Sequence, residues 1–297
     1  MINNVTVFGS GVLGAQIAFQ TAFRGFNVTL YDLADELLEK AREKFAVLGE
    51  SYKRDLGATD ADVASALARL TYTRDLARSV ADADLTIEAI PENIQIKKDF
   101  YSALAQVAPA KTIFCTNSST LLPSQFATET GRPERFLALH FANQIWVRNT
   151  AEIMGHPGTD PAVFDTVVAF AKAIGMVALP IHKEQPGYIL NSLLVPFLRA
   201  AWELHHLGVA DPETVDKTWM IATGAPVGPF AIMDVVGLTT IYNIVKLHAD
   251  ATDNAQDQNS AQALKEQFLD QGKLGALSGQ GFYCYPDPAY LKAEFLK

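Results

Sequence analysis

Cysteine is scarce in this sequence, and its scarcity excludes two kinds of architecture. The 297 residues include only two cysteines, Cys115 and Cys284, which lie far apart. Two distant cysteines make neither a disulfide framework nor a thiolate metal site. Cys115 lies in the apolar run TIFCTN, which favours a small buried side chain over a reactive thiol. The adjacent His205 and His206 point about 100° apart on a helix and are poor ligands for one metal, so we expect no metal site.

Long hydrophobic runs and an excess of basic residues are also missing. No run approaches eighteen uninterrupted apolar residues, so we expect no membrane span. The N-terminus has no basic segment followed by a signal-type apolar one, so we expect a cytoplasmic protein. The net charge is −9, which argues against a nucleic-acid partner. Any anionic ligand must be held locally, by helix N-termini or a few placed cations.

The beginning of the chain has the pattern of a nucleotide-binding turn. The β-rich run NVTVF leads directly into GSGVLG, in which three glycines have GxGxxG spacing: Gly9, Gly11 and Gly14. The first glycine allows a tight turn, the second lets the backbone approach a pyrophosphate, and the third lets the helix pack closely on the strand. The N–H groups at the start of the following helix, at Val12 and Leu13, would face the anion.

A carboxylate at the end of the next strand indicates which dinucleotide binds. The run NVTLYD ends in Asp32, where a carboxylate can accept hydrogen bonds from the adenosine ribose hydroxyls. It would repel a 2′-phosphate, and Leu33 follows it rather than an arginine, so we predict NAD rather than NADP. Taken alone, Asp32 is equally compatible with a solvated strand end.

Alternating strands and helices predict a Rossmann-type, doubly wound and mostly parallel sheet. Residues 34–70 are charged and helical and are predicted to stand off this sheet. Further strands are expected at 84–90, 112–117 and 135–141, with an amphipathic helix between the first two. Ligands of such sheets bind at the carboxyl ends of the strands. Polar side chains gather at these ends, namely Glu92, Asn117, Ser119 and His140.

The remainder of the chain predicts an all-α C-terminal domain. Pro186 opens a long apolar helix, in which Pro196 should produce a kink or a local break. Asp211 and Pro212 have the pattern of a helix start. Residues 224–248 are apolar almost all round, which predicts a helix that is deeply buried or lies in a subunit interface. We therefore also expect a homodimer.

Several motifs, in this order, resemble the L-3-hydroxyacyl-CoA dehydrogenase family and its bacterial 3-hydroxybutyryl-CoA dehydrogenases. They are GSGVLGAQIA, EAIPENIQIKKDFY, TNSSTL, RFLALHFAN, QPGYILNSLLVPFLRAAWEL, GAPVGPFAIMDVVGL and SGQGFYCY. The resemblance covers nearly the whole chain. It implies an NAD-binding domain at 1–184 and a helical substrate and dimerisation domain at 185–297. The implied reaction is the reversible NAD-linked oxidation of a 3-hydroxyacyl-CoA, and we expect a short acyl chain and a place in fatty acid metabolism.

The resemblance also assigns residues to the site. The family's catalytic histidine and its orienting glutamate match His140 and Glu152, and its substrate-contacting serine and asparagine match Ser119 and Asn191. Its cofactor contacts fall on Glu92 and Lys97. The predicted cofactor-binding set is Gly9, Gly11, Val12, Leu13, Gly14, Asp32, Glu92, Lys97 and Asn117.

These residue types suit the implied chemistry. A neutral imidazole at His140 can accept the hydroxyl proton as hydride leaves the substrate, and Glu152 would fix its tautomer and stabilise the imidazolium. Each residue also has an ordinary alternative. His140 alone fits a buried core histidine, Glu152 an exposed carboxylate on a strand, and Ser119 the N-cap of a helix at 122–128. Asn191 is a poor helix former inside a predicted helix, which favours a function.

Two cations on the helical excursion are candidates for the phosphates of CoA. Lys53 and Arg54 have the right charge, with a solvated helix face as the equal alternative.

The segment between the histidine and the glutamate departs from the family pattern. The family usually continues its histidine as His-Phe-Phe-Asn-Pro, whereas this chain has Ala142 and Gln144. An apolar approach to the glutamate is replaced by Arg148 and Asn149. Replacing proline by glutamine removes a fixed φ and adds an N–H donor. Because of these departures, the resemblance does not settle the acyl-chain preference or the need for CoA. The alternatives are therefore an NAD-dependent dehydrogenase of a free 3-hydroxy acid or sugar acid, as in the crystallin-like branch, and a non-catalytic NAD-binding relative.

Overall fold

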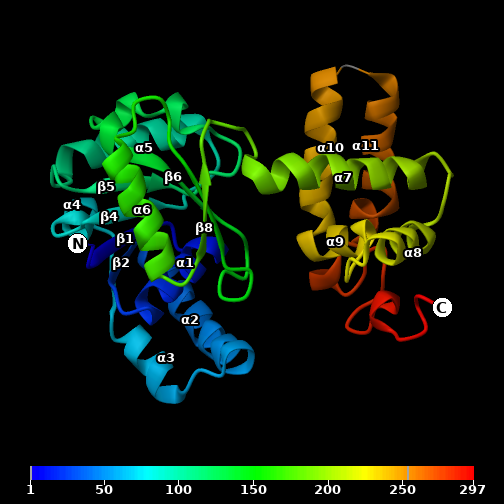
Figure 1. The fold of residues 1–297 in the computed structure, drawn as a ribbon, viewed down its shortest axis with the longest axis horizontal. Helices are drawn as coiled ribbons and strands as arrows, with labels where there is room; N and C mark the ends of the chain where they lie inside the picture. The colour runs from blue at the N-terminus through cyan, green and yellow to red at the C-terminus, as the bar shows by residue number, and fades with distance from the viewer. Residues whose placement is uncertain (1, 253) are drawn as a thin grey trace. The chain divides into compact units, whose positions relative to one another are not determined.

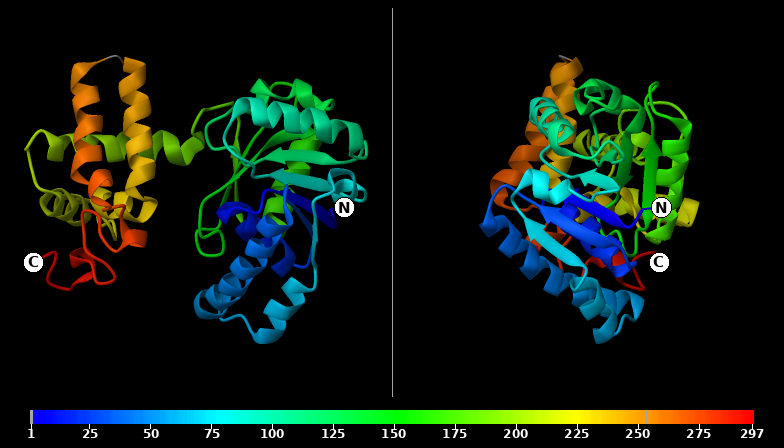
Figure 2. Two further views of the ribbon diagram at one scale, coloured as in Figure 1. Left: turned by 180° about the vertical axis from the view of Figure 1, so that it is seen from behind. Right: turned by 90° about the vertical axis from the view of Figure 1, so that its left-hand side faces the viewer.

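The chain divides into two compact units. The computed structural model describes residues 2–252 and 254–297, and contacts separate it into Met1–Ile189 and Leu190–Lys297 (Figures 1 and 2). The division falls a few residues beyond the predicted boundary at 184. The predicted fold class is confirmed, because a mostly parallel sheet with helices precedes a helical C-terminal part.

An eight-stranded sheet forms the centre of the first unit, in the order β3-β2-β1-β4-β5-β6-β7-β8. The strands are β1 (Asn4–Phe8), β2 (Asn27–Tyr31), β3 (Leu70–Thr73), β4 (Leu85–Glu88), β5 (Ile113–Thr116), β6 (Phe136–Phe141), β7 (Thr150–Met154) and β8 (Val177–Ile181). All neighbours pair in parallel except β6 and β7, which are antiparallel. The edge strands β3 and β8 lie outside the predicted strands.

Helices cover both faces of this sheet and bury its alternating apolar side chains. On one face lie α1 (Val12–Phe23), α2 (Asp35–Leu56) and α6 (Pro161–Ala173). On the other lie α4 (Leu76–Val80) and α5 (Ile94–Val107). The predicted helical excursion is formed by α2 and α3 (Asp60–Leu67), both of which contact α1. Figure 1 shows it as a blue helical pair attached beside the strands.

Among its described residues the second unit has five helices, of which the first begins in the preceding unit. They are α7 (Tyr188–His206), α8 (Pro212–Thr223), α9 (Pro229–Val236), α10 (Leu238–Thr252) and α11 (Ala255–Gln267). Short 3₁₀ turns occupy Pro123–Gln125, Thr128–Thr130, Pro133–Arg135, Leu269–Gln271, Ala276–Ser278 and Ala289–Leu291. The start of α8 is as predicted, since the Asp211 side chain accepts the Thr214 N–H at the N-cap. Helix α7 continues through Pro196 without a break.

The apolar stretch predicted as one helix at 224–248 is two helices. Gly237 ends α9 with a φ of +94°, and the two helices meet at a bend of 105°. Both helices are apolar on nearly every side because both contribute side chains to the core of the unit. These include Phe230, Met233 and Ile241. Among the described residues no single helix is long and apolar enough to cross a membrane, and only the bent α9–α10 pair passes by length and composition.

Two buried carboxylates tie α9 to its neighbours in the second unit, Asp216 from α8 and Asp234 to the C-terminal tail. Asp216 accepts the N–H groups of Phe230 and Ala231, at 2.9 and 3.0 Å. Asp234 accepts those of Phe282 and Tyr283, both at 2.9 Å. A Cβ on Gly281 would lie 2.0 Å from the Asp234 carboxylate, which explains the second glycine of the GQGFY sequence.

Candidate active site

His140 and Glu152 form a buried pair. They lie directly opposite each other on the antiparallel strands β6 and β7, so their side chains share one face of the sheet. Nδ1 of His140 is 3.0 Å from Oε2 of Glu152, and the two residues are only 6% and 4% exposed. A carboxylate at Nδ1 favours the tautomer protonated there and leaves the lone pair of Nε2 available as a proton acceptor.

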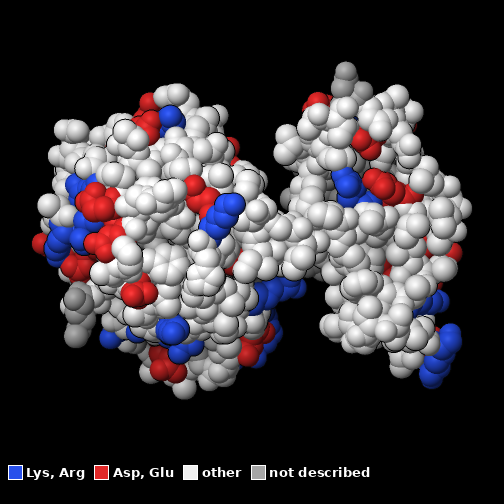
Figure 3. Space-filling view, turned by 45° about the horizontal axis from the view of Figure 1, so that its top comes forward, with Lys and Arg blue, Asp and Glu red and all other residues white. Residues whose placement is uncertain are grey.

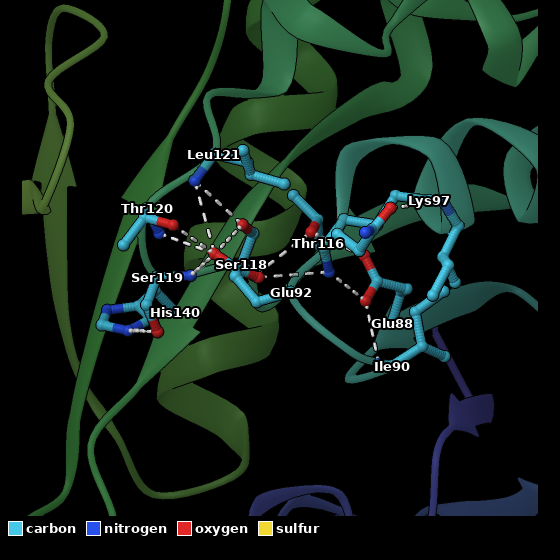
Figure 4. Close-up of polar contacts among 12 residues, drawn as sticks. Glu88, Ile90, Glu92, Lys97, Thr116, Ser118, Ser119, Thr120, Leu121 and His140 are labelled. Carbon is cyan, nitrogen blue, oxygen red and sulfur yellow. Dashed lines mark hydrogen bonds and ion pairs between the residues drawn. The ribbon is translucent and has the colours of Figure 1, made fainter. Parts of the chain in front are cut away.

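Ser119 faces the other nitrogen of the same imidazole. Its Oγ is 3.1 Å from Nε2 of His140 (Figure 4). The alternative helix at 122–128 does not form, because only a 3₁₀ turn at Pro123–Gln125 follows, with Leu122 as its N-cap. The structure therefore brings three predicted site residues together, with Nε2 at the carboxyl edge of the parallel strands, where ligands of such sheets bind.

The carboxylate of Glu92 holds the loop that carries Ser119. Its Oε1 accepts hydrogen bonds from the Ser118 hydroxyl at 2.6 Å, the Ser119 N–H at 3.0 Å and the Thr120 N–H at 2.8 Å. Figure 4 shows these bonds converging on one carboxylate. Burial alone raises the pKa of Glu92, but the bonds from Ser118 and Thr120 and the charge of Lys97 together hold this pKa below its ordinary value.

A buried ion pair supports Glu92 from inside the protein. Nζ of Lys97 is 2.6 Å from Oε1 of Glu88 and 3.5 Å from Oε2 of Glu92, and the Lys97 side chain is 1% exposed. The other oxygen of Glu88 accepts the Thr116 hydroxyl at 2.8 Å. Sequence analysis missed Glu88, although a carboxylate in the buried strand LTIE is an informative signal. Contacts of Lys97 and Glu92 with NAD stay predictions.

Asn117 joins the ends of three strands. Its Oδ1 accepts the Phe141 N–H at 3.0 Å, and its own N–H donates to the Glu88 carbonyl at 2.8 Å. These bonds tie the carboxyl ends of β4, β5 and β6 together next to His140. The predicted cofactor contact of Asn117 is untested by this geometry and stays a prediction.

The glycine turn has the shape that a dinucleotide requires. Gly9 has a φ of +92°, and a Cβ there would lie 2.5 Å from the Ala89 carbonyl oxygen. A Cβ on Gly14 would lie 1.9 Å from the Gly9 carbonyl oxygen. By contrast, a Cβ on Gly11 would meet nothing within 4 Å, so the backbone at the start of α1 is open to a ligand. Val12 is 65% exposed at the same helix start. This chain therefore fits NAD in its predicted place.

Asp32 follows β2 beside this turn. Its Oδ2 accepts the N–H and the hydroxyl of Ser10 at 2.7 and 2.6 Å, and its Oδ1 accepts the Leu33 N–H at 2.7 Å. The carboxylate is thus fixed at the end of the strand next to the glycines. That position is the one from which a carboxylate binds ribose hydroxyls in this kind of fold.

The two candidate phosphate-binding cations are already paired. Lys53 forms ion pairs with Glu50 at 2.9 Å and with Asp60. Arg54 is 2.7 Å from a carboxylate oxygen of Asp55. Acidic and basic side chains also lie next to each other on the face shown in Figure 3, with broad uncharged areas between them. Three carboxylates therefore accompany these two cations.

The segment that departs from the family pattern is anchored to the helical excursion. Trp146 donates its Nε1–H to Asp55 on α2 at 2.8 Å and lies against Tyr52, with ring centroids 5.6 Å apart. Of the departing residues, Gln144 and Arg148 are exposed, while Ala142 and Asn149 are half-buried.

Asn191 lies in the first turn of α7, within the second compact unit. Its predicted contact with substrate stays a prediction. Tyr188, at the start of the same helix, was missed by sequence analysis. Its ring lies on the imidazole of His140, and no local pattern marks such a long-range contact.

The chain is similar to known dehydrogenases along nearly its whole length. The chain matches "3-hydroxyacyl-CoA dehydrogenase, NAD binding domain" over residues 4–185 and "3-hydroxyacyl-CoA dehydrogenase, C-terminal domain" over residues 187–285. The mitochondrial hydroxyacyl-coenzyme A dehydrogenase of Homo sapiens is 34% identical over 96% of this chain and 92% of its own length. A probable 3-hydroxybutyryl-CoA dehydrogenase of Bacillus subtilis is 31% identical over 96% and 98%.

A solved structure is more similar still in sequence. It is a diketoreductase studied for substrate-directed dual catalysis of dicarbonyl compounds. It is 55% identical to this chain, with a TM-score of 0.91, and the match covers 96% of this chain and 99% of the other.

Proposed function

Because the chain belongs to the 3-hydroxyacyl-CoA dehydrogenase family and is an NAD-dependent oxidoreductase, we propose that it interconverts a short-chain 3-hydroxyacyl-CoA, such as 3-hydroxybutyryl-CoA, and the 3-ketoacyl-CoA. The observation that carries the proposal is the imidazole of His140. One of its nitrogens faces Glu152 and the other faces Ser119, near the carboxyl end of β6.

The proton step falls to His140. In the oxidation direction, Nε2 of the neutral imidazole accepts the C3 hydroxyl proton of the substrate as hydride leaves C3. NAD, when bound, supplies the hydride acceptor. Glu152 lies 3.0 Å from Nδ1 and stabilises the imidazolium that results, with both groups shielded from solvent. In the reduction direction the imidazolium returns this proton to the forming hydroxyl.

The other site residues hold and orient. Ser119 lies within hydrogen-bond reach of Nε2, so its hydroxyl can also hydrogen-bond a substrate oxygen placed beside the imidazole. The glycine turn and the start of α1 would hold the pyrophosphate, and Asp32 the ribose hydroxyls. We also propose that Asn191 contacts the substrate, as the family resemblance implies.

Steady-state kinetics test this function. Oxidation of NADH with acetoacetyl-CoA is compared for wild type, His140→Ala and the control His182→Ala. Loss of a general base or acid typically costs about 100- to 10,000-fold in rate, and we expect that loss at position 140 alone. Wild-type turnover of a free keto acid or ester, with none of any 3-ketoacyl-CoA, would overturn the CoA assignment.

A second candidate function is reduction of a dicarbonyl compound without CoA. Two observations favour it. The cations expected to meet CoA phosphates, Lys53 and Arg54, are paired with carboxylates. A diketoreductase is also 55% identical over nearly the whole chain. Including a diketo ester beside acetoacetyl-CoA in the same assay decides between the two, because kcat/KM for each substrate measures the preference directly.

We further propose that the protein is a homodimer through its second unit. Exposed apolar side chains on its helices support this, namely Leu193, Ile221 and Leu247. The mass in solution, measured by light scattering, tests the proposal, and a monomer at micromolar concentration would contradict it. The cytoplasmic location and the place in fatty acid metabolism stay predictions.

A further inference from the structure

The ring of Tyr188 lies flat on the imidazole of His140. The ring centroids are 4.4 Å apart and the planes differ by 17°. Tyr188 is 1% exposed, so the contact is shielded from water. One face of the imidazole is therefore covered, while its two nitrogens face Glu152 and Ser119. Together these contacts fix both the plane of the ring and the direction of its nitrogens.

The backbone adopts an unusual conformation to reach this position. Pro186 and Gly187 make a turn that is closed by the Tyr188 N–H donating to the Gln185 carbonyl at 3.0 Å. Tyr188 itself has a φ of +56°, in the left-handed region that residues other than glycine seldom adopt. Such a conformation persists only where the surroundings over-determine it, and it is concentrated at functional sites.

The hydroxyl of Tyr188 reaches the loop that carries the serine. It donates to the Ser118 carbonyl at 2.7 Å. Burial, followed by the nearby charges of Glu92 and Glu152, raises the pKa of Tyr188, so the hydroxyl keeps its proton and stays a donor. The single side chain therefore contacts the histidine through its ring and the backbone next to Ser119 through its oxygen.

The next residue holds the other member of the pair. The N–H of Ile189 donates to Oε1 of Glu152 at 2.8 Å, while Oε2 of the same carboxylate faces His140. Two consecutive residues at the start of α7 thus contact both members of the His140–Glu152 pair. Neither contact is between residues close in sequence.

We propose that Tyr188 is a positioning residue for proton transfer, its ring setting the plane of His140 and its hydroxyl setting the loop of Ser119. The proposal rests on the proposed function, because it takes His140 as the group that exchanges the proton. When the imidazole is protonated, the ring also offers its negative face to a cation. Tyr188 therefore acts on the rate of the chemical step rather than on binding.

Two substitutions separate the ring from the hydroxyl. Tyr188→Phe keeps the stacked ring, and Tyr188→Leu removes it. Since a displacement of about 1 Å can cost about 100-fold in rate, we expect Tyr188→Leu to lower kcat by about 10- to 100-fold. Tyr188→Phe should recover most of this loss, and the part that remains measures the contribution of the hydroxyl bond to the Ser118 carbonyl. The KM for the keto substrate and the Kd for NADH should change less than about 3-fold in both variants. Tyr72→Leu, at the opposite edge of the sheet, is the matched control.

A spectroscopic measurement gives the same answer without turnover. An aromatic ring stacked on an imidazole shields its ring protons, so the carbon-bound ring protons of His140 should resonate upfield of those of exposed histidines. The signal is assigned by its loss in His140→Ala. It should stay in place in Tyr188→Phe and move downfield in Tyr188→Leu.

The outcomes separate the two proposals. Kinetic loss in Tyr188→Leu with recovery in Tyr188→Phe, together with the shift of the His140 signal, supports positioning. A kcat of Tyr188→Leu within 2-fold of wild type, or an unmoved His140 signal, overturns it. Wild-type inactivity toward every 3-ketoacyl-CoA and dicarbonyl overturns the proposed function alone, and the His140 signal then decides whether Tyr188 orients the imidazole.

Discussion

Gln144 donates its backbone N–H to the side-chain Oε1 of Gln16 at 2.8 Å. This bond joins the loop after β6 to α1, the helix that begins at the glycine turn. Gln144 also has a φ of +61°. A proline is fixed near −65° and has no N–H, so it can satisfy neither requirement. The loop therefore has a backbone conformation at this position that glutamine adopts and proline cannot.

We predict that Gln144→Pro destabilises the protein and that Gln144→Gly does not. The proline removes a hydrogen bond and forces the backbone out of its conformation, so the free energy of unfolding should fall by about 2 kcal/mol or more. Glycine tolerates the positive φ and keeps the N–H, and its effect should stay within about 1 kcal/mol. Chemical denaturation measures both, and equal stability of the two variants would contradict the loop path.

Anchoring of the Ser119 loop by Glu92 leads to a second prediction. Ser118→Ala removes a donor to the carboxylate and, with it, the acceptor of the Leu121 N–H. If Glu92 acts through the loop, Ser118→Ala and Glu92→Gln should both lower kcat by about 10-fold, since the serine hydroxyl is then displaced from His140. The Kd for NADH should change little in Ser118→Ala. A Glu92→Gln variant that loses NADH affinity at unchanged kcat would instead favour the predicted cofactor contact.

The same carboxylate predicts a dependence of stability on pH. In the folded protein the pKa of Glu92 lies below its ordinary value of 4.5. The folded state therefore binds this proton less readily than the unfolded chain does. Its contribution to stability is therefore full above about pH 4.5 and is lost as the pH falls through the folded-state pKa. Denaturation midpoints measured from pH 7 down to pH 3 should fall less steeply for Glu92→Gln than for wild type. Parallel curves would refute this assignment.

Cofactor preference should depend on Asp32. A carboxylate near the ribose repels a 2′-phosphate by about 1 kcal/mol at an exposed site, which corresponds to about a fivefold preference. Asp32→Asn keeps one carbonyl oxygen that can accept both Ser10 bonds, and it removes the charge. We expect the ratio of kcat/KM for NADH to that for NADPH to fall by at least this factor, and to stay constant in the control Asp35→Asn. A constant ratio in Asp32→Asn would exclude the carboxylate as the discriminator.

Local signals allowed much of the fold to be predicted. The glycine turn and the helix start at Asp211 depend on residues a few positions apart, and both are found. The edge strands β3 and β8 were missed because most of their residues are half-buried or exposed, so neither has a buried apolar run. The bend at Gly237 was missed because α9 and α10 are both apolar, which hid the break between them.

The site was predicted only in part for a similar reason. His140 and Glu152 were found through family resemblance, and the sheet register explains their meeting. Tyr188 was not found, since its contact with the Ser118 carbonyl spans 70 positions of the chain. Glu88 was overlooked although it lies in a buried strand, because its partner Lys97 comes from the following helix, nine positions along the chain.

The pairing of β6 with β7 has a consequence for how such a protein can evolve. The distance between His140 and Glu152 is set by strand register, and a slip by one residue would turn the two side chains to opposite faces. The side chains of residues 142–149 form no part of that pairing, which joins Ala138–Phe141 to Ala151–Met154. Substitutions that keep the length and the anchoring contacts of this loop should therefore leave the spacing of His140 and Glu152 unchanged, so new substrates can be explored without moving the pair. Libraries confined to this hairpin loop are therefore the natural starting point for engineering selectivity.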